Sequence, residues 1–252
     1  MISPLALHGF VTYDLASRIG VADDTRYAAL CAIFDDLPED PYARGSGRHR
    51  RYARGLILPW SGQFMWIPPG AEGIRVGLNG YYQEKHNPEH AGQVRYLPDI
   101  GEKARSNGLL LDLVMFDFQQ TYWGEDDLAF PLHVGVHLVK LVADRDGVEA
   151  VTSPNELHQD GESFTFAHLI YRRNSEGGVN VVAPPRFRGE QPEDVPRGER
   201  LAEFQLSSPL ESYGVADKLV CHYVSPIRKG KGVGQGERAV VLADFTPTRQ
   251  VF

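Results

Sequence analysis

From about residue 130 onward, the chain is a series of short segments rich in β-branched and aromatic residues, separated by glycine, proline or asparagine. Such segments predict β-strands, because these side chains fill a pleated, half-buried surface and the intervening residues favour turns. The candidate strands are Leu132–Val142, Ser163–Arg172, Val179–Ala183, Leu201–Leu206, Lys218–Val224 and Arg238–Phe245. The 17 prolines and 26 glycines agree with many tight turns. This pattern predicts a two-sheet jelly roll, whose mouth between the sheets is a common place for small ligands.

The clearest helical patterns lie in the first half of the chain. Ala22–Leu37 has apolar residues at helical spacing, and Asp23 and Asp24 can cap its start. A second helix is predicted at Leu109–Gln120. Helices early and strands late predict an α+β, mainly β fold.

We therefore expect one domain over residues 1–252. A chain of this length suits a single large domain. Its helical N-terminal part, about residues 1–120, is expected to pack on one sheet, and about residues 130–252 are expected to form the jelly-roll core.

Composition and charge exclude several functional classes. Apolar residues make up 42% and charged residues 23%, which is typical of a globular protein with a buried core. No apolar run is long enough for a membrane helix, and the first residues do not resemble a secretory signal. The two cysteines, Cys31 and Cys221, are not in a C-x-x-C pair. We therefore expect a cytoplasmic protein without disulfides, and the net charge of −7 argues against a nucleic-acid partner.

Two polar segments have more than one interpretation. The basic run Arg44–Arg54 is either a solvated loop entering a strand or a source of arginines that face an anionic small molecule. The segment Arg186–Arg200 is either a surface excursion between strands or a lid over the mouth of the jelly roll.

The pair His158 and Asp160 carries the clearest chemical signal. In an extended backbone, residues i and i+2 project to the same face, so an imidazole and a carboxylate would point to one place. Two histidines and one carboxylate form the facial triad of non-haem Fe(II) enzymes, which leaves coordination positions open. The pair alone is a weak signal, because chance produces such pairs and a surface or core histidine explains them as well.

A third ligand would have to come from elsewhere in the chain. His222 lies in an apolar strand candidate, where it is either a ligand or a core histidine. The glycine-rich segment Gly230–Gly236 does not fit a nucleotide-binding motif and predicts a hairpin tip. Arg238 would then begin a strand beside the one that carries His222. There it is either a surface residue or a cation that grips the carboxylate of a cosubstrate.

The chain resembles the bacterial Fe(II)/2-oxoglutarate oxygenases typified by L-isoleucine dioxygenase, which hydroxylate free amino acids. The resemblance is carried, in order, by Arg50-Arg51-Tyr52, Tyr82-Gln83, Gln93–Leu97, Val136–Lys140, Ser153–Gly161, Arg173-Asn174, Gly177-Gly178, Phe204–Leu206, Pro209-Leu210, His222–Ile227, Gly236–Arg238 and Asp244-Phe245. It departs from the expected pattern at Lys140 and Asn155, which leaves the particular amino acid open.

The resemblance implies a double-stranded β-helix of the cupin-like, jelly-roll class. It implies that His158, Asp160 and His222 bind Fe(II), and that Arg238 binds the distal carboxylate of 2-oxoglutarate. No catalytic residue beyond the metal ligands is expected. O2 is the co-substrate, and ascorbate is the expected reductant.

A free amino acid offers a carboxylate and an ammonium group to its binding site. Arg95 and Gln83 are candidates for this role, with His137 as a third. Each also has a structural explanation: an edge-strand charge, a turn residue and a packed core histidine, respectively. His168 follows His158 at even spacing, so it either lines the same cavity or is a hydrogen-bonded core residue.

Other functions remain open from the sequence. The same cofactor chemistry can end in desaturation or ring closure of an amino acid. A metal-binding cupin-like binding module or isomerase is a different class, which would have no need of an arginine for 2-oxoglutarate. A protein or nucleic-acid hydroxylase is disfavoured by the acidic charge balance. The oligomeric state is also left open, since homodimers are common but no apolar stripe argues for one.

Overall fold

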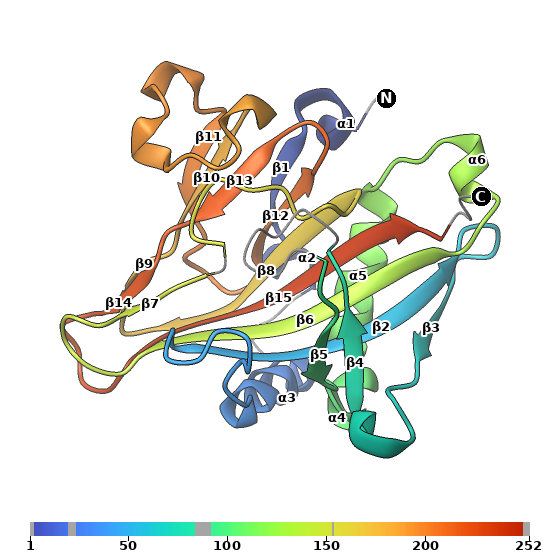
Figure 1. Cartoon of the computed structure of the whole chain (residues 1–252), viewed down its shortest axis with the longest axis horizontal. Coiled ribbons are helices and arrows are strands. Elements are labelled where there is room, and N and C mark those ends of the chain that lie inside the picture. The colour runs from blue at the N-terminus through green and yellow to red at the C-terminus, as the bar shows by residue number, and fades with distance from the viewer. Residues whose placement is uncertain (1–2, 20–23, 84–91, 153, 249–252) are drawn as a thin grey trace.

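A seven-stranded antiparallel sheet with the strand order β1-β12-β8-β15-β6-β2-β3 runs through the structure (Figure 1). The computed structural model describes residues 3–19, 24–83, 92–152 and 154–248. The strands of this sheet are β1 (Phe10–Asp14), β2 (Arg48–Leu58), β3 (Gln63–Ile67), β6 (Leu132–Ala143), β8 (Phe164–Arg173), β12 (Glu211–Ala216) and β15 (Gly236–Pro247). The strands β6 and β15 pair over all 12 residues of each and form its centre.

Smaller sheets accompany the large one. One joins β11 (Ala202–Gln205), β10 (Val179–Ala183) and β13 (Cys221–Val224), and another joins β7 (Glu149–Ala150), β14 (Ile227–Lys229) and β9 (Ser175–Gly177). A hairpin of β4 (Leu78–Tyr81) and β5 (Arg95–Pro98) lies near β2. The chain leaves the small sheet after β11, adds β12 to the large sheet and returns with β13. Residues from both sheets therefore enclose the space between them.

Two of the helices, α3 (Thr25–Ile33) and α5 (Gly108–Gln120), pack on the face of the large sheet that points away from the smaller sheets. The other helices are α1 (Pro4–His8), α2 (Ala16–Ile19), α4 (Glu102–Arg105) and α6 (Glu125–Leu128), with 3-10 helices η2 (Phe34–Asp36), η3 (Gly73–Arg75), η5 (Pro185–Phe187), η6 (Pro192–Asp194) and η7 (Arg197–Glu199). Leu30 of α3 and Leu113 of α5 are fully buried in one apolar cluster with Val136 of β6 and Phe166 of β8. Figure 1 shows α5 behind the sheet and α3 below β2.

The structure confirms a mainly β architecture, with strands close to the expected bounds. The strand expected at Lys218–Val224 begins only at Cys221, because the residues before it form a turn that Leu219 closes by donating its amide to Ala216. The helix expected at Ala22–Leu37 is α3, which Asp24 caps by accepting a hydrogen bond from the Arg26 amide, followed by η2. Ala22 and Asp23 lie outside the described residues.

The N-terminal part differs from the helical one expected at about residues 1–120. It also supplies β1, β2 and β3 to the large sheet and forms the β4–β5 hairpin. Most of the basic run Arg44–Arg54 belongs to β2, with Arg48 and Arg50 buried, so the solvated-loop interpretation was wrong for these residues. Alternation along the strand turns these arginines and Tyr52 toward one face.

The expected pairing of the Arg238 strand with the His222 strand was wrong. β15 pairs with β6 and β8, whereas β13 pairs with β10, because β14 intervenes and the chain changes sheets. The glycine-rich segment joins β14 to β15. It is held by Asn174, whose side chain donates to the carbonyls of Gly232 and Gly234 and accepts from the Gly232 amide.

The segment Arg186–Arg200 contains short 3-10 helices and contributes no residue to the cavity between the sheets. Its residues Gly189 and Glu190 exchange backbone hydrogen bonds with Leu157, which precedes the first predicted ligand. It is therefore a surface excursion that supports that loop. None of the described helices is long and apolar enough to cross a membrane.

Candidate metal centre and its cavity

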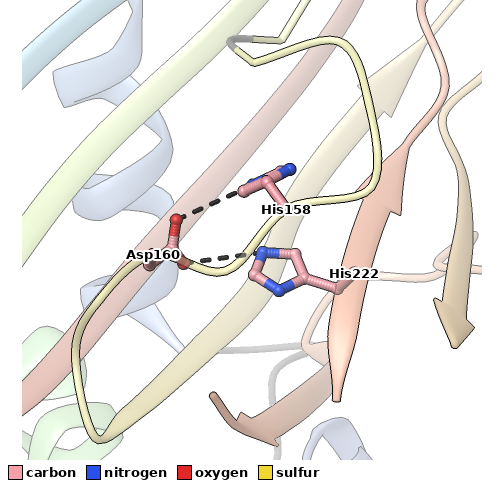
Figure 2. A group of neighbouring side chains, drawn as sticks. All are labelled: His158, Asp160 and His222. Carbon is pink, nitrogen blue, oxygen red and sulfur yellow. Dashed lines mark ion pairs between the residues drawn. The ribbon is translucent and has the colours of Figure 1, made fainter. Parts of the chain in front are cut away.

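His158, Asp160 and His222 meet at the mouth between the sheets (Figure 2). One ligand atom from each of the three residues lies within 4.8 Å of the others. Nε2 of His158 is 3.7 Å from Oδ1 of Asp160, and Nε2 of His222 is 3.5 Å from Oδ2. The structure thus brings together the three side chains that the sequence singled out.

Backbone contacts fix the two histidines relative to each other. His158 and His222 form an isolated antiparallel bridge in which each amide donates to the other carbonyl at 2.9 Å. The carbonyl oxygen of Glu156 accepts a hydrogen bond from Nδ1 of His158 at 2.8 Å. This bond selects the tautomer in which the Nε2 lone pair of His158 is free to bind a metal.

Asp217 holds the loop that carries Asp160. Its carboxylate accepts hydrogen bonds from the amides of Asp160 and Gly161, each at 2.8 Å. Its backbone carbonyl also accepts a hydrogen bond from the side chain of Gln159. Burial, reinforced by the nearby charge of Asp160, raises the pKa of Asp217 to about 7.

The electrostatics of the three residues suit a divalent cation. Burial, followed by the proximity of His158, lowers the pKa of His222 to about 4, so this imidazole is neutral at pH 7. Burial tends to raise the pKa of Asp160, but the two histidines outweigh it and the pKa is lowered. Two imidazoles and one ionised carboxylate on one side of a site match the donor set of non-haem Fe(II). Nδ1 of His222 is buried without a hydrogen-bond partner in the described part of the chain.

A cavity opens from this cluster along the large sheet. It is lined by side chains from β2, β6, β8, β12, β13 and β15 and from the β4–β5 hairpin region. All the predicted ligand-binding residues reach it: Arg238, Arg95, Gln83 and His137 line the same cavity as the three clustered residues.

Arg238 is a buried cation without a carboxylate partner among the described residues. Its side chain is 3% exposed, and its Nε makes no hydrogen bond. Burial lowers its pKa to about 10, and the charged or titratable neighbours that influence it are Tyr213 and Arg172. An unpaired guanidinium is costly to bury, so this position favours an anionic ligand.

Arg95 and Gln83 form a chain of contacts to the metal cluster. Arg95 donates a hydrogen bond to the side-chain oxygen of Gln83, whose amide donates to the Asp160 carbonyl at 3.1 Å. Burial, followed by repulsion from Arg50, lowers the pKa of Arg95 to about 10. The guanidinium groups of Arg95 and Arg50 lie over the ring of Tyr81. Their central carbon atoms are 4.8 Å and 5.1 Å, respectively, from the ring centroid.

His137 has both ring nitrogens engaged. Nδ1 is 2.7 Å from Nη2 of Arg50, and Nε2 is 2.8 Å from Oδ2 of Asp244. Its ring stacks on Tyr52 with the centroids 4.3 Å apart. The imidazole therefore orients its neighbours and has no free nitrogen for a ligand.

Sequence reasoning did not single out Asp244 or Tyr81, although both line the cavity. Asp244 lies in the Asp-Phe pair that ended the resemblance, but nothing local showed which face it occupies. Arg50 could be found only as one of several arginines in the basic run. Lys140 and Asn155, the two departures from the expected pattern, do not line the cavity.

His168 lies on the other face of the sheet, where the hydrogen-bonded core role is confirmed. It is fully buried, with Nδ1 2.8 Å from the Ser212 hydroxyl and Nε2 2.8 Å from a carboxylate oxygen of Asp117.

Comparisons with known proteins agree with this geometry. The 2OG-Fe dioxygenase family model matches residues 31–244. The chain is 30% identical to L-isoleucine-4-hydroxylase of Bacillus thuringiensis over 221 residues, covering 85% of this chain and 82% of that protein. It is 26% identical to 3(1)-hydroxy-L-isoleucine 4-dioxygenase of Pantoea ananatis (strain AJ13355) over 221 residues, covering 84% and 77%.

The fold is also that of a solved structure. The crystal structure of IDO from Bacillus thuringiensis superposes with a TM-score of 0.71 at 22% identity, covering 97% of this chain and 93% of that one. The family match spans most of the chain and includes the three clustered residues, so this protein belongs to the 2OG-Fe dioxygenase family.

Proposed function

We propose that this dioxygenase hydroxylates an unactivated C–H bond of a free amino acid or amino-acid-like small molecule, releasing succinate and CO2. The observation that carries the proposal is the cavity itself. A buried, unpaired Arg238 and the cluster of His158, Asp160 and His222 line one space. We also infer that the large sheet and the smaller sheets opposite it form a double-stranded β-helix in one domain.

In this proposal His158, Asp160 and His222 bind Fe(II) on one side. The bound iron supplies the activation of O2 and the oxidation of the C–H bond, with ascorbate as the external reductant. The protein's own part is to keep the imidazole of His222 neutral and the carboxylate of Asp160 ionised. The bridge between His158 and His222 and the contacts of Asp217 hold these side chains before a metal binds.

Arg238 would bind the distal carboxylate of 2-oxoglutarate. It lies on β15 near Gly178, where an added Cβ would come within 3.0 Å of the arginine Cδ. Packing against Gly178 restricts the guanidinium, and its hydrogen-bond donors are available to a ligand in the cavity. A guanidinium and a carboxylate form a pair of parallel hydrogen bonds, which fixes the orientation of the cosubstrate as well as its affinity.

The walls between these charges are apolar. Val139 and Leu141 of β6 and Val240 and Leu242 of β15 face the cavity. Such a wall excludes water and packs against an aliphatic side chain, so that one C–H bond is held near the metal. The two curated relatives act, by their names, on isoleucine or a hydroxylated isoleucine, which supports an aliphatic amino acid as the substrate.

Arg95, Gln83 and His137 would complete the substrate side. Arg95 offers a buried cation for a carboxylate, and Gln83 connects it to the backbone of Asp160. His137 acts through Arg50 and Asp244, whose positions it fixes.

The test is an incubation of the purified protein in air with Fe(II), ascorbate, 2-oxoglutarate and a panel of free amino acids. Mass spectrometry follows succinate and the mass of every amino acid. Succinate together with one amino acid that gains an oxygen atom is the expected result. Loss of two hydrogens would replace hydroxylation by desaturation or ring closure. Absence of succinate under all conditions, with no binding of 2-oxoglutarate to the iron-loaded protein, would contradict the proposal.

A further inference from the structure

Asp244 is a buried carboxylate that lines the cavity without a lysine or arginine paired to it in the described part of the chain. Its exposed fraction is 3%. Oδ1 accepts a hydrogen bond from the Gly135 amide at 3.1 Å, and Oδ2 accepts one from Nε2 of His137 at 2.8 Å. A carboxylate has about four acceptor positions, so about two are left for a ligand. Burial raises the pKa of Asp244 to about 6, as expected for an anion that lacks a cation.

The histidines near Asp244 are neutral imidazoles, and Arg50 acts on Asp244 from the far side of the His137 ring. Burial, followed by the charges of Arg50 and Arg95, lowers the pKa of His137 well below its usual value. Burial also lowers the pKa of His133, which influences Asp244 from the same strand. Neither imidazole offers Asp244 the full positive charge that would offset its burial.

The protonation of His137 follows from its partners. A guanidinium can only donate hydrogen bonds, so Nη2 of Arg50 donates to Nδ1, and Nδ1 is the unprotonated nitrogen. Nε2 therefore carries the proton and donates it to Asp244. Because Tyr52 stacks on the ring, Arg50 and Asp244 are fixed on opposite sides of one imidazole.

The cavity thus has a cation and an anion separated by the width of one ring. Nη1 of Arg50 is 3.9 Å from Oδ2 of Asp40. Arg95, which joins Arg50 over the face of Tyr81, has no carboxylate partner among the described residues. An α-amino acid carries its carboxylate and its ammonium on the same carbon atom, with the charges in the opposite order. It would offset the buried charges of Asp244 and Arg95 at once.

We propose that Asp244 binds the α-ammonium group of the substrate while Arg50 and Arg95 bind its α-carboxylate, with His137 as the positioning residue between them. This inference rests on the proposed oxygenase function and deepens it. The enzyme then requires a free amine. N-acylated, peptide-bound or desamino compounds lose the contact to Asp244 and leave a buried charge unpaired.

The first experiment uses the wild-type enzyme, so it does not depend on a variant. Each proteinogenic L-amino acid is compared with its N-acetyl derivative and with its 2-hydroxy acid analogue, in the presence of Fe(II), 2-oxoglutarate and O2. Succinate formation above the level without a substrate, and the product mass, are recorded. We expect turnover of at least one free amino acid and a loss of about 10- to 100-fold in kcat/KM for its N-acetyl and 2-hydroxy analogues, as for an unpaired charged hydrogen bond.

The second experiment compares Asp244→Asn with the wild type. We expect the KM for the amino acid to rise by about 10- to 100-fold, while the KM for 2-oxoglutarate and the Fe(II) content change little. The preference for the amino acid over its 2-hydroxy analogue should shrink, which a merely structural role would not produce. Asp144→Asn is the matched control, because Asp144 is exposed and outside the cavity.

The outcomes separate this inference from the proposed function. Equal turnover of free and N-acetylated amino acids, or unchanged discrimination in a folded Asp244→Asn protein, would overturn the ammonium site and leave the oxygenase intact. Succinate formation that no free amino acid stimulates would also overturn it. If no succinate forms under any condition, the oxygenase proposal itself fails and the ammonium site fails with it.

Discussion

His158 and His222, 64 positions apart in the sequence, are joined by an antiparallel backbone bridge with both N···O distances at 2.9 Å. The bridge ties the loop before β8 to the small sheet at the point where their imidazoles converge. Because these hydrogen bonds are made by the backbone, they survive replacement of either side chain. The metal site can therefore be dissected by substitution without dismantling the fold around it.

His222→Ala should abolish Fe(II) binding and succinate formation while leaving the metal-free protein folded. The substitution removes one of three ligands, but it breaks no hydrogen bond of the side chain among the described residues, because Nδ1 of His222 is unpaired. Iron content after anaerobic loading, succinate yield and thermal unfolding check this. His8→Ala, at an exposed position, is the control. Full activity in the His222→Ala protein would remove this residue from the metal site.

Arg238→Lys should weaken 2-oxoglutarate binding by about 10- to 100-fold, because an ammonium group cannot reproduce the paired hydrogen bonds of a guanidinium. Iron binding should be unchanged. The KM for 2-oxoglutarate, measured beside the iron affinity, checks the assignment. The control is Arg228→Lys, an exposed arginine paired with Glu149. An equal loss of iron affinity would argue instead for a structural defect.

Asp217→Asn should lower Fe(II) affinity by about 10- to 100-fold, the usual effect of changing a residue that orients a metal ligand. Both carboxylate oxygens accept amide protons from the loop that carries Asp160, and an asparagine can accept only one of them. Competition with a chromogenic chelator measures the affinity. Asp146→Asn, a change at an exposed aspartate, should have no effect. The same affinity in both variants would show that the loop does not depend on Asp217.

The parts of this structure that were predictable are those with a local pattern. β6, β10 and β15 were expected near their observed bounds, because β-branched runs bounded by turn residues leave few alternatives. The convergence of His158, Asp160 and His222 was expected from the two-residue spacing of the first pair and from an ordered series of resemblances. No single one of these signals would have been sufficient.

The parts that could not be predicted depend on which strands become neighbours. β15 was expected beside β13, yet it pairs with β6 and β8, because the short β14 lets the chain change sheets. The position of Asp244 could not be predicted for the same reason. Its place opposite Gly135 and beside His137 is set by the register of β15 on β6, which is determined by packing between distant segments.

His222 should contribute a loss of stability to the metal-free protein as the pH is lowered from about 6.5 to about 4. Its pKa in the folded state is about 4. In this window the unfolded chain binds a proton at His222 that the folded protein does not bind, a difference worth on the order of 3 kcal/mol. Asp217 and Asp244, with pKa values raised to about 7 and about 6, act in the opposite direction, since each gains a proton in the folded protein before it does in the unfolded chain.

Comparison with His222→Gln isolates the contribution of His222, because Asp244 is present in both proteins. Measured by urea unfolding, the free energy of unfolding of the wild type should fall relative to that of His222→Gln by on the order of 3 kcal/mol as the pH is lowered from about 6.5 to about 4. Parallel profiles would mean that His222 is protonated in the folded protein.

Gly135→Ala should mimic the loss of Asp244, although it changes no charge. Gly135 lies opposite Asp244 on the neighbouring strand, and an added Cβ would lie 2.4 Å from both carboxylate oxygens. The carboxylate would have to move away from the Gly135 amide and from His137. We expect the KM for the amino acid to rise and that for 2-oxoglutarate to stay near the wild-type value. Gly198→Ala adds a Cβ that meets no atom within 4 Å at a glycine without a positive φ, and it therefore controls for the backbone change. If Gly135→Ala proves as active as the wild type on every amino acid, Asp244 does not need its present position, and the contact to the substrate ammonium would have to be sought elsewhere in the cavity.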